Sequence, residues 1–227
     1  MKTMQSLQIK RPSWEELSQY ACVFFDFDGV IVESGDIKTE AFMELYAEFG
    51  IQEAVKKHHL ENQGVSRFDK FEWIAKYLLN EVYTAEKGAE LSARFSALVK
   101  EKVIASPSVP GIAELILALR RNSAFLVVAS GTPEAELKEI MNKRGIDVHF
   151  DEIHGSPKSK ASIVQSVMKA GAYPSGKCLF IGDASTDYDA ARQEGLDFYA
   201  RLTPELADYW SSTDYRFGTE DFNQIVY

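Results

Sequence analysis

Short apolar runs, rich in β-branched and aromatic residues, recur along the chain and have the length of buried β-strands. They occupy residues 21–25, 125–129, 177–181 and, more weakly, 197–200. Between them, apolar positions recur with helical spacing at residues 111–121, 134–144, 160–170 and 187–195. Strands that alternate with helices in this way predict an α/β fold: a Rossmann-like, doubly wound parallel sheet with helices on both faces.

Residues 33–106 follow a different pattern, because they have helical periodicity and contain no convincing strand. The periodic segments are residues 38–49, 68–79 and 85–103. An all-helical insertion directly after the first strand predicts a cap over the edge of the sheet. The stretch 106–111 contains two prolines and a glycine, which break helices, and is the expected return connection. We therefore expect an α/β core of residues 1–32 and 107–227, with an α-helical cap of residues 33–106.

Composition and charge narrow the class of protein. The net charge of −9 over 227 residues argues against a nucleic-acid-binding surface, which usually needs clustered Lys and Arg. No apolar run is long enough for a membrane span, and the N-terminus lacks the apolar segment of a signal peptide. Cys22 and Cys178 lie in expected buried strands, which favours free thiols over a disulfide. We expect a cytoplasmic monomer or homodimer without a membrane or nucleic-acid partner, and a short helix at residues 14–20 with no assigned role.

The first expected strand ends at two carboxylates, Asp26 and Asp28, followed by Gly29. Two carboxylates this close repel each other, so both stay ionised at a dry site only beside a cation. Mg²⁺ suits that position, because it prefers oxygen ligands and phosphate oxygens. One carboxylate can attack phosphorus, while the other protonates the leaving oxygen and later deprotonates water. Taken alone, the pair is equally well explained as an acidic turn.

Two further acids, Asp183 and Asp187, follow the strand expected at residues 177–181. Ligands of parallel α/β sheets bind outside the carboxyl ends of the strands, so we expect Asp183 on the same sheet edge as Asp26. Asp187 falls in the first turn of the next helix, where an acid also suits the helix dipole. The dipole explains Asp187 better when it is considered alone, whereas the combination with Asp26 favours a metal site.

Ser130 and Gly131 follow the strand expected at residues 125–129. A hydroxyl and free backbone amides at the start of a helix form a phosphate-binding site. The alternative is an ordinary helix N-cap at Thr132, which needs no ligand.

Lys158 and Lys160 precede the next expected helix, and one of them could neutralise phosphate beside Asp26. We favour Lys160, because it stands immediately before that helix. Most lysines are solvated surface residues, so this assignment depends on the other three clusters.

In this order, each at a strand end, the four clusters resemble the motifs of the haloacid dehalogenase-like hydrolase superfamily. The resemblance extends over residues 21–195. The catalytic and phosphate-binding residues that it implies are Asp26 as nucleophile, Asp28 as general acid and base, and Ser130, Gly131 and Lys160 as phosphate ligands. The Mg²⁺ ligands that it implies are Asp26, the carbonyl of Asp28, Asp183 and, directly or through water, Asp187.

An acid at the position of Asp28 is typical of the phosphatases and phosphomutases of this superfamily, in which a leaving alkoxide must be protonated. The helical insertion resembles the small cap of the phosphoglycolate phosphatase and β-phosphoglucomutase branch. Within it, the segment 64–67 resembles a substrate-specificity loop, and Arg67 would then contact a second anionic or hydroxyl-rich part of the substrate. A helix-breaking turn with a solvated arginine is the alternative.

Lys38 is a departure from this branch, because many relatives have His at that position, four residues after Ser34. A lysine there argues against a mutase and favours an acidic substrate. We therefore expect a magnesium-dependent phosphatase that acts on a small phosphorylated metabolite, with a sugar phosphate or phosphorylated sugar acid as the leading substrate class. A β-phosphoglucomutase-like mutase is the nearest alternative, and a non-catalytic, receiver-like Mg²⁺-binding module is an alternative of another class.

Overall fold

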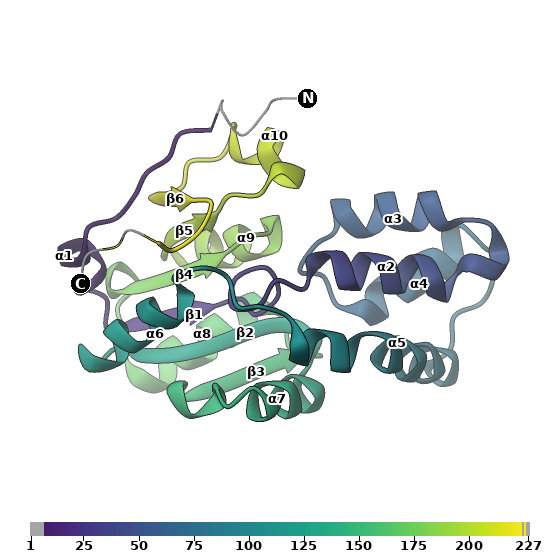
Figure 1. The fold of residues 1–227 in the computed structure, drawn as a ribbon, viewed down its shortest axis with the longest axis horizontal. Helices are drawn as coiled ribbons and strands as arrows, with labels where there is room; N and C mark the ends of the chain where they lie inside the picture. The colour runs from purple at the N-terminus through teal and green to yellow at the C-terminus, as the bar shows by residue number, and fades with distance from the viewer. Residues whose placement is uncertain (1–6, 224, 226–227) are drawn as a thin grey trace.

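A single parallel β-sheet forms the centre of the molecule (Figure 1). The computed structural model describes residues 7–223 and 225. The sheet has six strands in the order β3-β2-β1-β4-β5-β6. These are β1 (Cys22–Phe25), β2 (Phe125–Pro133), β3 (Glu152–Ser156), β4 (Cys178–Gly182), β5 (Asp197–Arg201) and β6 (Phe217–Thr219). The predicted Rossmann-like α/β fold is confirmed, and the four expected strands are β1, β2, β4 and β5.

Strand β1 lies between β2 and β4 and is buried along its whole length. Its alternate side chains enter two different cores. Val23 and Phe25 pack on the side of the helices α6 (Ile112–Arg121) and α7 (Glu134–Lys143). Cys22 and Phe24 pack on the side of α8 (Lys160–Gly171) and α9 (Ser185–Glu194). Burial on both faces explains why the sequence here is continuously apolar.

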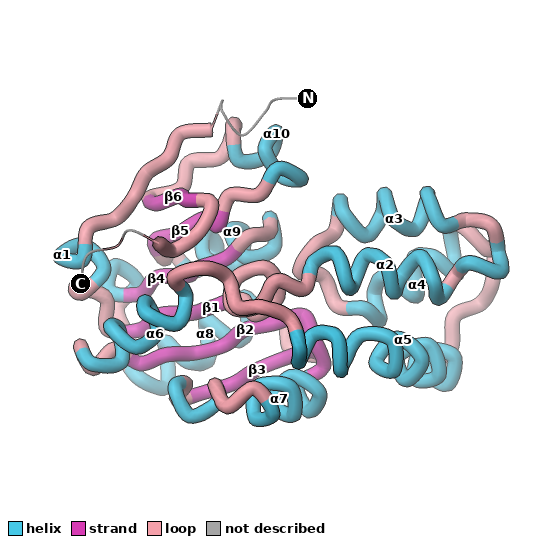
Figure 2. Tube along the Cα trace, in the orientation of Figure 1, coloured by secondary structure: helices cyan, strands magenta, loops and turns pink. Residues whose placement is uncertain are grey.

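The segment between β1 and α6 is helical and lies to one side of the sheet (Figure 2). Its helices are α2 (Gly35–Leu45), α3 (Gln52–Glu61), α4 (Arg67–Tyr77) and α5 (Ala85–Ala105), with a 3₁₀ turn at Ala47–Phe49. The two connections to the core run side by side, because the Val109 N–H donates to the Ile31 carbonyl at 3.1 Å and the Glu33 N–H donates to the Pro107 carbonyl at 3.0 Å. The cap therefore joins the core through one narrow, paired connection.

Aromatic side chains form the interior of this helical segment. The ring centroid of Phe42 lies 5.7 Å from that of Phe71 and 4.6 Å from that of Phe95. The three rings come from α2, α4 and α5, so one cluster joins three of the cap helices. Such tilted aromatic contacts stabilise a core beyond the apolar area that they bury.

Several elements escaped the sequence patterns. Strand β3 is half-buried over most of its length and carries polar residues such as Glu152 and His154, so it lacks an apolar run. Strand β6 is only 3 residues long. Helix α3 has only Val55 and His59 buried, which leaves little periodicity to detect. The other unpredicted short elements are α10 (Ala207–Trp210) and 3₁₀ turns at Asp147–His149, Ser175–Lys177 and Pro204–Leu206, whereas the short helix expected at residues 14–20 is present as α1 (Trp14–Leu17).

The structure bears on the expectations about membrane spans and about the two cysteines. Within the described residues, no helix combines the length and apolar character needed to cross a bilayer. Cys22 and Cys178 are both free, buried thiols on neighbouring strands.

Phe71→Ala should destabilise the protein strongly, because Phe71 is fully buried between α2 and α5 and its loss leaves a cavity. We expect the free energy of unfolding to fall by about 3–5 kcal/mol in urea titrations. Val82→Ala is the matched control, since Val82 is 83% exposed, and it should change the free energy by less than about 0.5 kcal/mol. Equal stabilities of the two variants would contradict a packed cap interior.

Candidate active site

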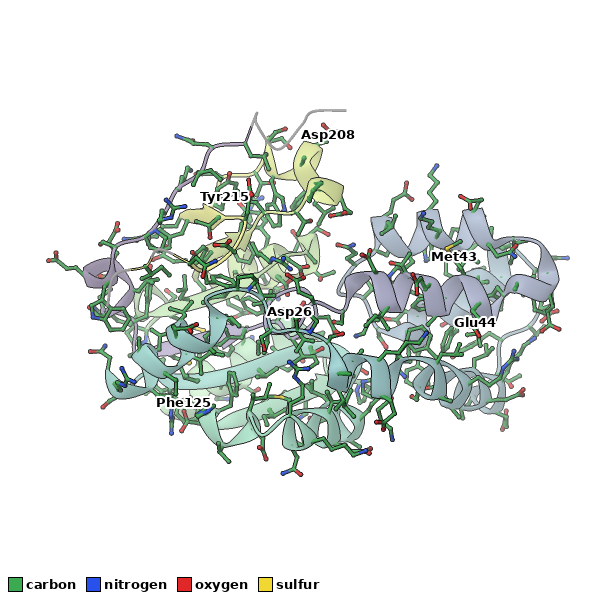
Figure 3. The ribbon with its side chains drawn as sticks, viewed as in Figure 1. Asp26, Met43, Glu44, Phe125, Asp208 and Tyr215 are labelled. Atoms are coloured by element: carbon green, nitrogen blue, oxygen red, sulfur yellow. The ribbon has the colours of Figure 1, made fainter. Side chains whose placement is uncertain are left out.

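Asp26 follows β1 directly and lies where the carboxyl edge of the sheet meets the cap (Figure 3). The Asp26 N–H donates to the Ile181 carbonyl at 2.9 Å, which continues the pairing of β1 with β4. Its Oδ1 accepts the Phe27 N–H at 2.7 Å, and its Oδ2 lies 2.9 Å from the Nζ of Lys160. Both carboxylate oxygens are therefore oriented by the protein, and the side chain is buried.

Asp26, Asp183 and Asp187 form a compact acidic group, with a carboxylate oxygen of each within 4.8 Å of the others. Asp183 follows β4, and Asp187 lies in the first turn of α9. The Oδ2 of Asp187 accepts the Ala184 N–H at 3.0 Å, which fixes the turn between them. Gly29 makes room for this group, because a Cβ there would lie 2.0 Å from Asp183 Oδ2 and its φ of +76° favours glycine.

The pKa values show that this group is crowded with negative charge. Burial, together with the charges of Asp187 and Asp28 and against the opposing charge of Lys160, raises the pKa of Asp26 to about 7. Burial and the charges of Asp26 and Asp187 also raise the pKa of Asp183 well above its ordinary value. Three converging carboxylates with only one ammonium group between them fit a hard divalent cation with oxygen ligands. Asp26, Asp183 and Asp187 are the residues that could hold it.

Lys160 is the first residue of α8, and Ser159 caps that helix. Its Nζ lies 2.6 Å from Asp187 Oδ1, in addition to its contact with Asp26. Burial alone would lower the pKa of Lys160, but the charges of Asp187 and Asp26 outweigh it and the pKa is raised. Lys158, in contrast, is exposed and lies 3.6 Å from Glu134 Oε2. Of the two lysines that the sequence left open, the structure brings Lys160 to Asp26.

Ser130 lies in β2 beyond its pairing with β1, next to Asp28. Its Oγ accepts the Thr132 N–H at 3.1 Å and donates to Asp28 Oδ2 at 3.5 Å. The alternative that Thr132 is an ordinary helix N-cap is wrong, because β2 continues to Pro133 and Pro133 is the N-cap of α7. Thr132 Oγ1 instead donates to Asp28 Oδ2 at 3.1 Å. Gly131 lines the cavity beside it.

Asp28 is held by the cap as well as by the core. Ser34 Oγ donates to its Oδ1 at 2.6 Å, and Lys38 Nζ, from the cap helix α2, forms an ion pair with its Oδ2. Lys38 also donates to Thr132 Oγ1 at 2.8 Å. Burial would raise the pKa of Asp28, but the charge and hydrogen bond of Lys38, with those of Ser34 and Thr132, hold it below its ordinary value. Lys38 thus belongs to the site, whereas the sequence marked it only as a departure from related chains.

Arg67 is buried and connects the cap to the core. Its guanidinium donates to both carboxylate oxygens of Glu136 on α7, at 2.7 and 3.1 Å, and to Ser96 Oγ at 2.8 Å. It also lies over the ring of Phe95, with its Cζ 4.7 Å from the centroid. The alternative of a solvated arginine is therefore wrong, and the acidic partner 69 residues away in the sequence was not expected.

A cavity between the cap and the sheet edge is lined by several of these residues, whereas Ser130 and Lys160 line a neighbouring pocket. The core-side lining of the cavity is Asp26, Asp28, Gly131, Thr132 and Asp183. Its cap-side lining is Gly35, Lys38, Phe42, His59, Gln63, Gly64, Val65, Arg67, Lys70 and Phe95. Nothing in the sequence patterns singled out Lys70. Its spacing could have revealed it, because one buried face of α4 has the helical spacing of Arg67, Lys70, Phe71 and Ile74.

Comparisons with known proteins identify the family of the chain. A model of the haloacid dehalogenase-like hydrolase family matches residues 20–195. A phosphoglycolate phosphatase from Synechococcus elongatus is 22% identical over 178 residues, which cover 77% of this chain and 80% of that protein. A phosphonoacetaldehyde hydrolase from Bordetella pertussis is 22% identical over 190 residues, which cover 76% of this chain and 68% of that protein.

A solved structure of a β-phosphoglucomutase from Clostridium difficile superposes with a TM-score of 0.74 at 19% identity, covering 92% of this chain and 94% of that one. This likeness shows a shared fold. The family match spans every strand-end cluster, from Asp26 to Asp187. The resemblance predicted from those clusters is confirmed: the chain belongs to the haloacid dehalogenase-like hydrolase family and is an enzyme of the phosphatase type.

Proposed function

We propose that the protein is a magnesium-dependent phosphatase that hydrolyses a small phosphomonoester through an aspartyl-phosphate on Asp26. One observation carries the proposal: the Asp26 carboxylate lines a cavity with Asp28 while Lys160 and two further carboxylates surround it. A nucleophile, an acid/base and a cation-binding group then converge on one space that can hold a phosphate. A receiver-like module without catalysis has no need for Asp28 or for a cavity under a cap.

The first half of the reaction depends on Asp26. Its oxygens are oriented by the Phe27 N–H and Lys160 before substrate arrives, so little reorganisation is needed for in-line attack. Lys160 and Ser130 would receive the equatorial oxygens of the phosphoryl group. Mg²⁺ held by Asp26, Asp183, Asp187 and the Asp28 carbonyl would neutralise part of the phosphoryl charge.

The second half depends on Asp28. Lys38 keeps Asp28 ionised in the structure, which is the form that deprotonates water and completes hydrolysis. Protonation of the leaving oxygen needs the acid form instead. A phosphate group entering beside Lys38 would attract its ammonium and weaken the ion pair, so that burial and the phosphate charge would raise the pKa of Asp28 and favour its acid form.

We assign Arg67 primarily to closure of the cap. The guanidinium group of Arg67 already donates to Glu136 and Ser96, so binding a substrate anion would require its buried ion pair with Glu136 to break. The loop between α3 and α4 also packs against the core, because Thr186 Oγ1 donates to the Gln63 carbonyl at 3.2 Å. Closure excludes water from the reaction. Hydrogen-bonding side chains in the cap-side lining, such as Lys38, Gln63 and Lys70, support a sugar phosphate or phosphorylated sugar acid as substrate.

Asp26→Asn should abolish the hydrolysis of p-nitrophenyl phosphate, because an amide cannot form the covalent intermediate. We expect the rate of phosphate release to fall by at least about 10³-fold. Asp214→Asn is the control, since this acid is 98% exposed, and it should keep the wild-type rate. An Asp26→Asn variant that folds and retains wild-type turnover would exclude Asp26 as nucleophile.

Chelation of divalent metal should stop phosphate release, and Mg²⁺ should restore it. Mg²⁺ should also raise the stability of the chelator-treated protein, by about 2.7 kcal/mol at a concentration 100-fold above its dissociation constant. Asp183→Asn should weaken this stabilisation, because it removes one carboxylate of the acidic group. The metal assignment fails if the metal-free protein keeps full activity and Mg²⁺ leaves its melting temperature unchanged.

The structural likeness to a β-phosphoglucomutase makes a mutase the alternative worth testing. With a sugar monophosphate and a catalytic amount of the corresponding bisphosphate, we expect inorganic phosphate in amounts equal to the substrate consumed. Phosphate release and isomer formation can be followed together by ³¹P NMR. An isomeric sugar phosphate that accumulates without inorganic phosphate would identify a mutase.

A further inference from the structure

Lys70 is a cavity residue that the proposed reaction does not use. It belongs to the buried face of α4 and is only 4% exposed, yet it lines the same cavity as Asp26 and Asp28. A lysine with so little exposure normally has an acidic partner. Its position therefore calls for a physical explanation.

The contacts of Lys70 are all to uncharged groups. Its Nζ lies 3.0 Å from Nδ1 of His59 and 5.3 Å from the centroid of the Phe42 ring. Burial, together with the charge of Lys70, lowers the pKa of His59 to about 2, so the imidazole is neutral and accepts the hydrogen bond. Within the described part of the chain, no carboxylate lies within ion-pair distance of Lys70.

The other cations around the cavity are each matched by an acid. The pairs are Lys38 with Asp28, Arg67 with Glu136, and Lys160 with Asp26 and Asp187. Lys70 is the exception among these four described cations. The cap-side lining of the cavity therefore includes one ammonium group, that of Lys70, without an acidic partner among the described residues.

The pKa of Lys70 reflects this lack of a partner. Burial, with the charges of Lys38 and Lys160 and against the opposing charge of Asp28, lowers the pKa of Lys70 to about 7. Near neutral pH, the free protein thus holds Lys70 in both its neutral and its charged form. An anion placed beside Lys70 would favour the charged form and offset the cost of burying it.

We propose that Lys70 binds a carboxylate at the end of the substrate remote from the phosphate, and so selects phosphorylated carboxylic acids over phosphorylated alcohols. This inference rests on the proposed function, and it names the substrate class of that site. A carboxylate carries one charge and matches one ammonium group. A second phosphate carries about −1.5 to −2 and would leave an excess of negative charge in a buried position. A hydroxyl would not compensate the ammonium at all.

The surroundings of Lys70 strengthen such a contact. Phe42 and Phe95 line the cavity near it, so a bound carboxylate would be shielded from water. Charge-assisted hydrogen bonds are stronger where the local dielectric is low. The neutral His59 holds the amine in place without competing for its charge.

Matched ligands test the proposal by isothermal titration calorimetry with Mg²⁺ present. The pairs are 6-phosphogluconate with sorbitol 6-phosphate, and 2-phosphoglycolate with 2-hydroxyethyl phosphate, in which a carboxylate replaces a hydroxymethyl group. The Asp26→Asn background prevents turnover, so binding is measured whether or not the protein is a phosphatase. We expect at least one acid to bind about 10-fold or more tightly than its alcohol, the effect of one charged hydrogen bond.

Lys70→Met should reduce this preference to less than about 2-fold while the affinity for the alcohols stays the same, because only the charge contact is lost. Lys76→Met is the matched control, an exposed lysine on the same helix, and it should keep the full preference. Equal affinities for acid and alcohol in both pairs, or a preference that survives Lys70→Met, would overturn the proposal.

Proton uptake gives a second readout that a merely structural lysine would not change. Above pH 7, binding of the acid should take up a proton onto Lys70, measured in two buffers of different ionisation enthalpy. Lys70→Arg should keep the preference for the acid but lose this uptake, because its guanidinium is already charged. Uptake that is the same for acid and alcohol would contradict the role of Lys70. A wild-type protein that releases no phosphate from any ester would refute the proposed function instead.

Discussion

The arrangement of the site depends on how three buried or half-buried carboxylates share one ammonium group. Asp26, Asp183 and Asp187 converge from the ends of β1 and β4 and from the start of α9, and Lys160 reaches two of them. Burying the carboxylates without the ammonium group, or the ammonium group without the carboxylates, would cost too much free energy. Because one positive charge cannot balance three negative ones, the group has an electrostatic need for a further cation. That need makes this edge of the sheet suited to phosphate, since the same cation can neutralise phosphoryl oxygens.

The cap contributes charges that complete the site from the other side. Lys38 pairs with Asp28, and Arg67 pairs with Glu136, so two ion pairs join the cap to the core around the cavity. Buried pairs of this kind add little net stability but penalise any arrangement in which one partner loses the other. They therefore define one closed arrangement of cap and core. Gly64 permits the close approach, because a Cβ at that position would lie 2.0 Å from Thr186 Oγ1.

The sequence was sufficient for the centre of the fold and for the core side of the site. Strand β1 is buried on both faces and is therefore apolar throughout, while β3, with Glu152 and His154 in it, gives no such run. The position of Asp26 beside the other acids follows from its place at a strand end, which is a local feature.

The cap side of the site could not be predicted in the same way. The partner of Arg67 lies on a helix of the core, and no local pattern connects the two positions. Lys70 was missed because a search for apolar periodicity passes over a lysine, although Phe71 and Ile74 mark the face on which it lies.

Proteins named for three different reactions resemble this chain in sequence or in fold, so the core alone cannot determine the substrate. The acidic group and Lys160 suit any phosphoryl group and distinguish only weakly between the molecules that carry it. Selection must come from residues that meet the rest of the substrate, and these lie on α2 and α4 of the cap. The cationic side chains Lys38 and Arg67 on these helices form ion pairs with acids of the core. Lys70 is the exception among the cations described above. A site of this design can change its substrate through one cap position, because among the described residues Lys70 forms no ion pair with the carboxylates that hold Lys160 and Lys38.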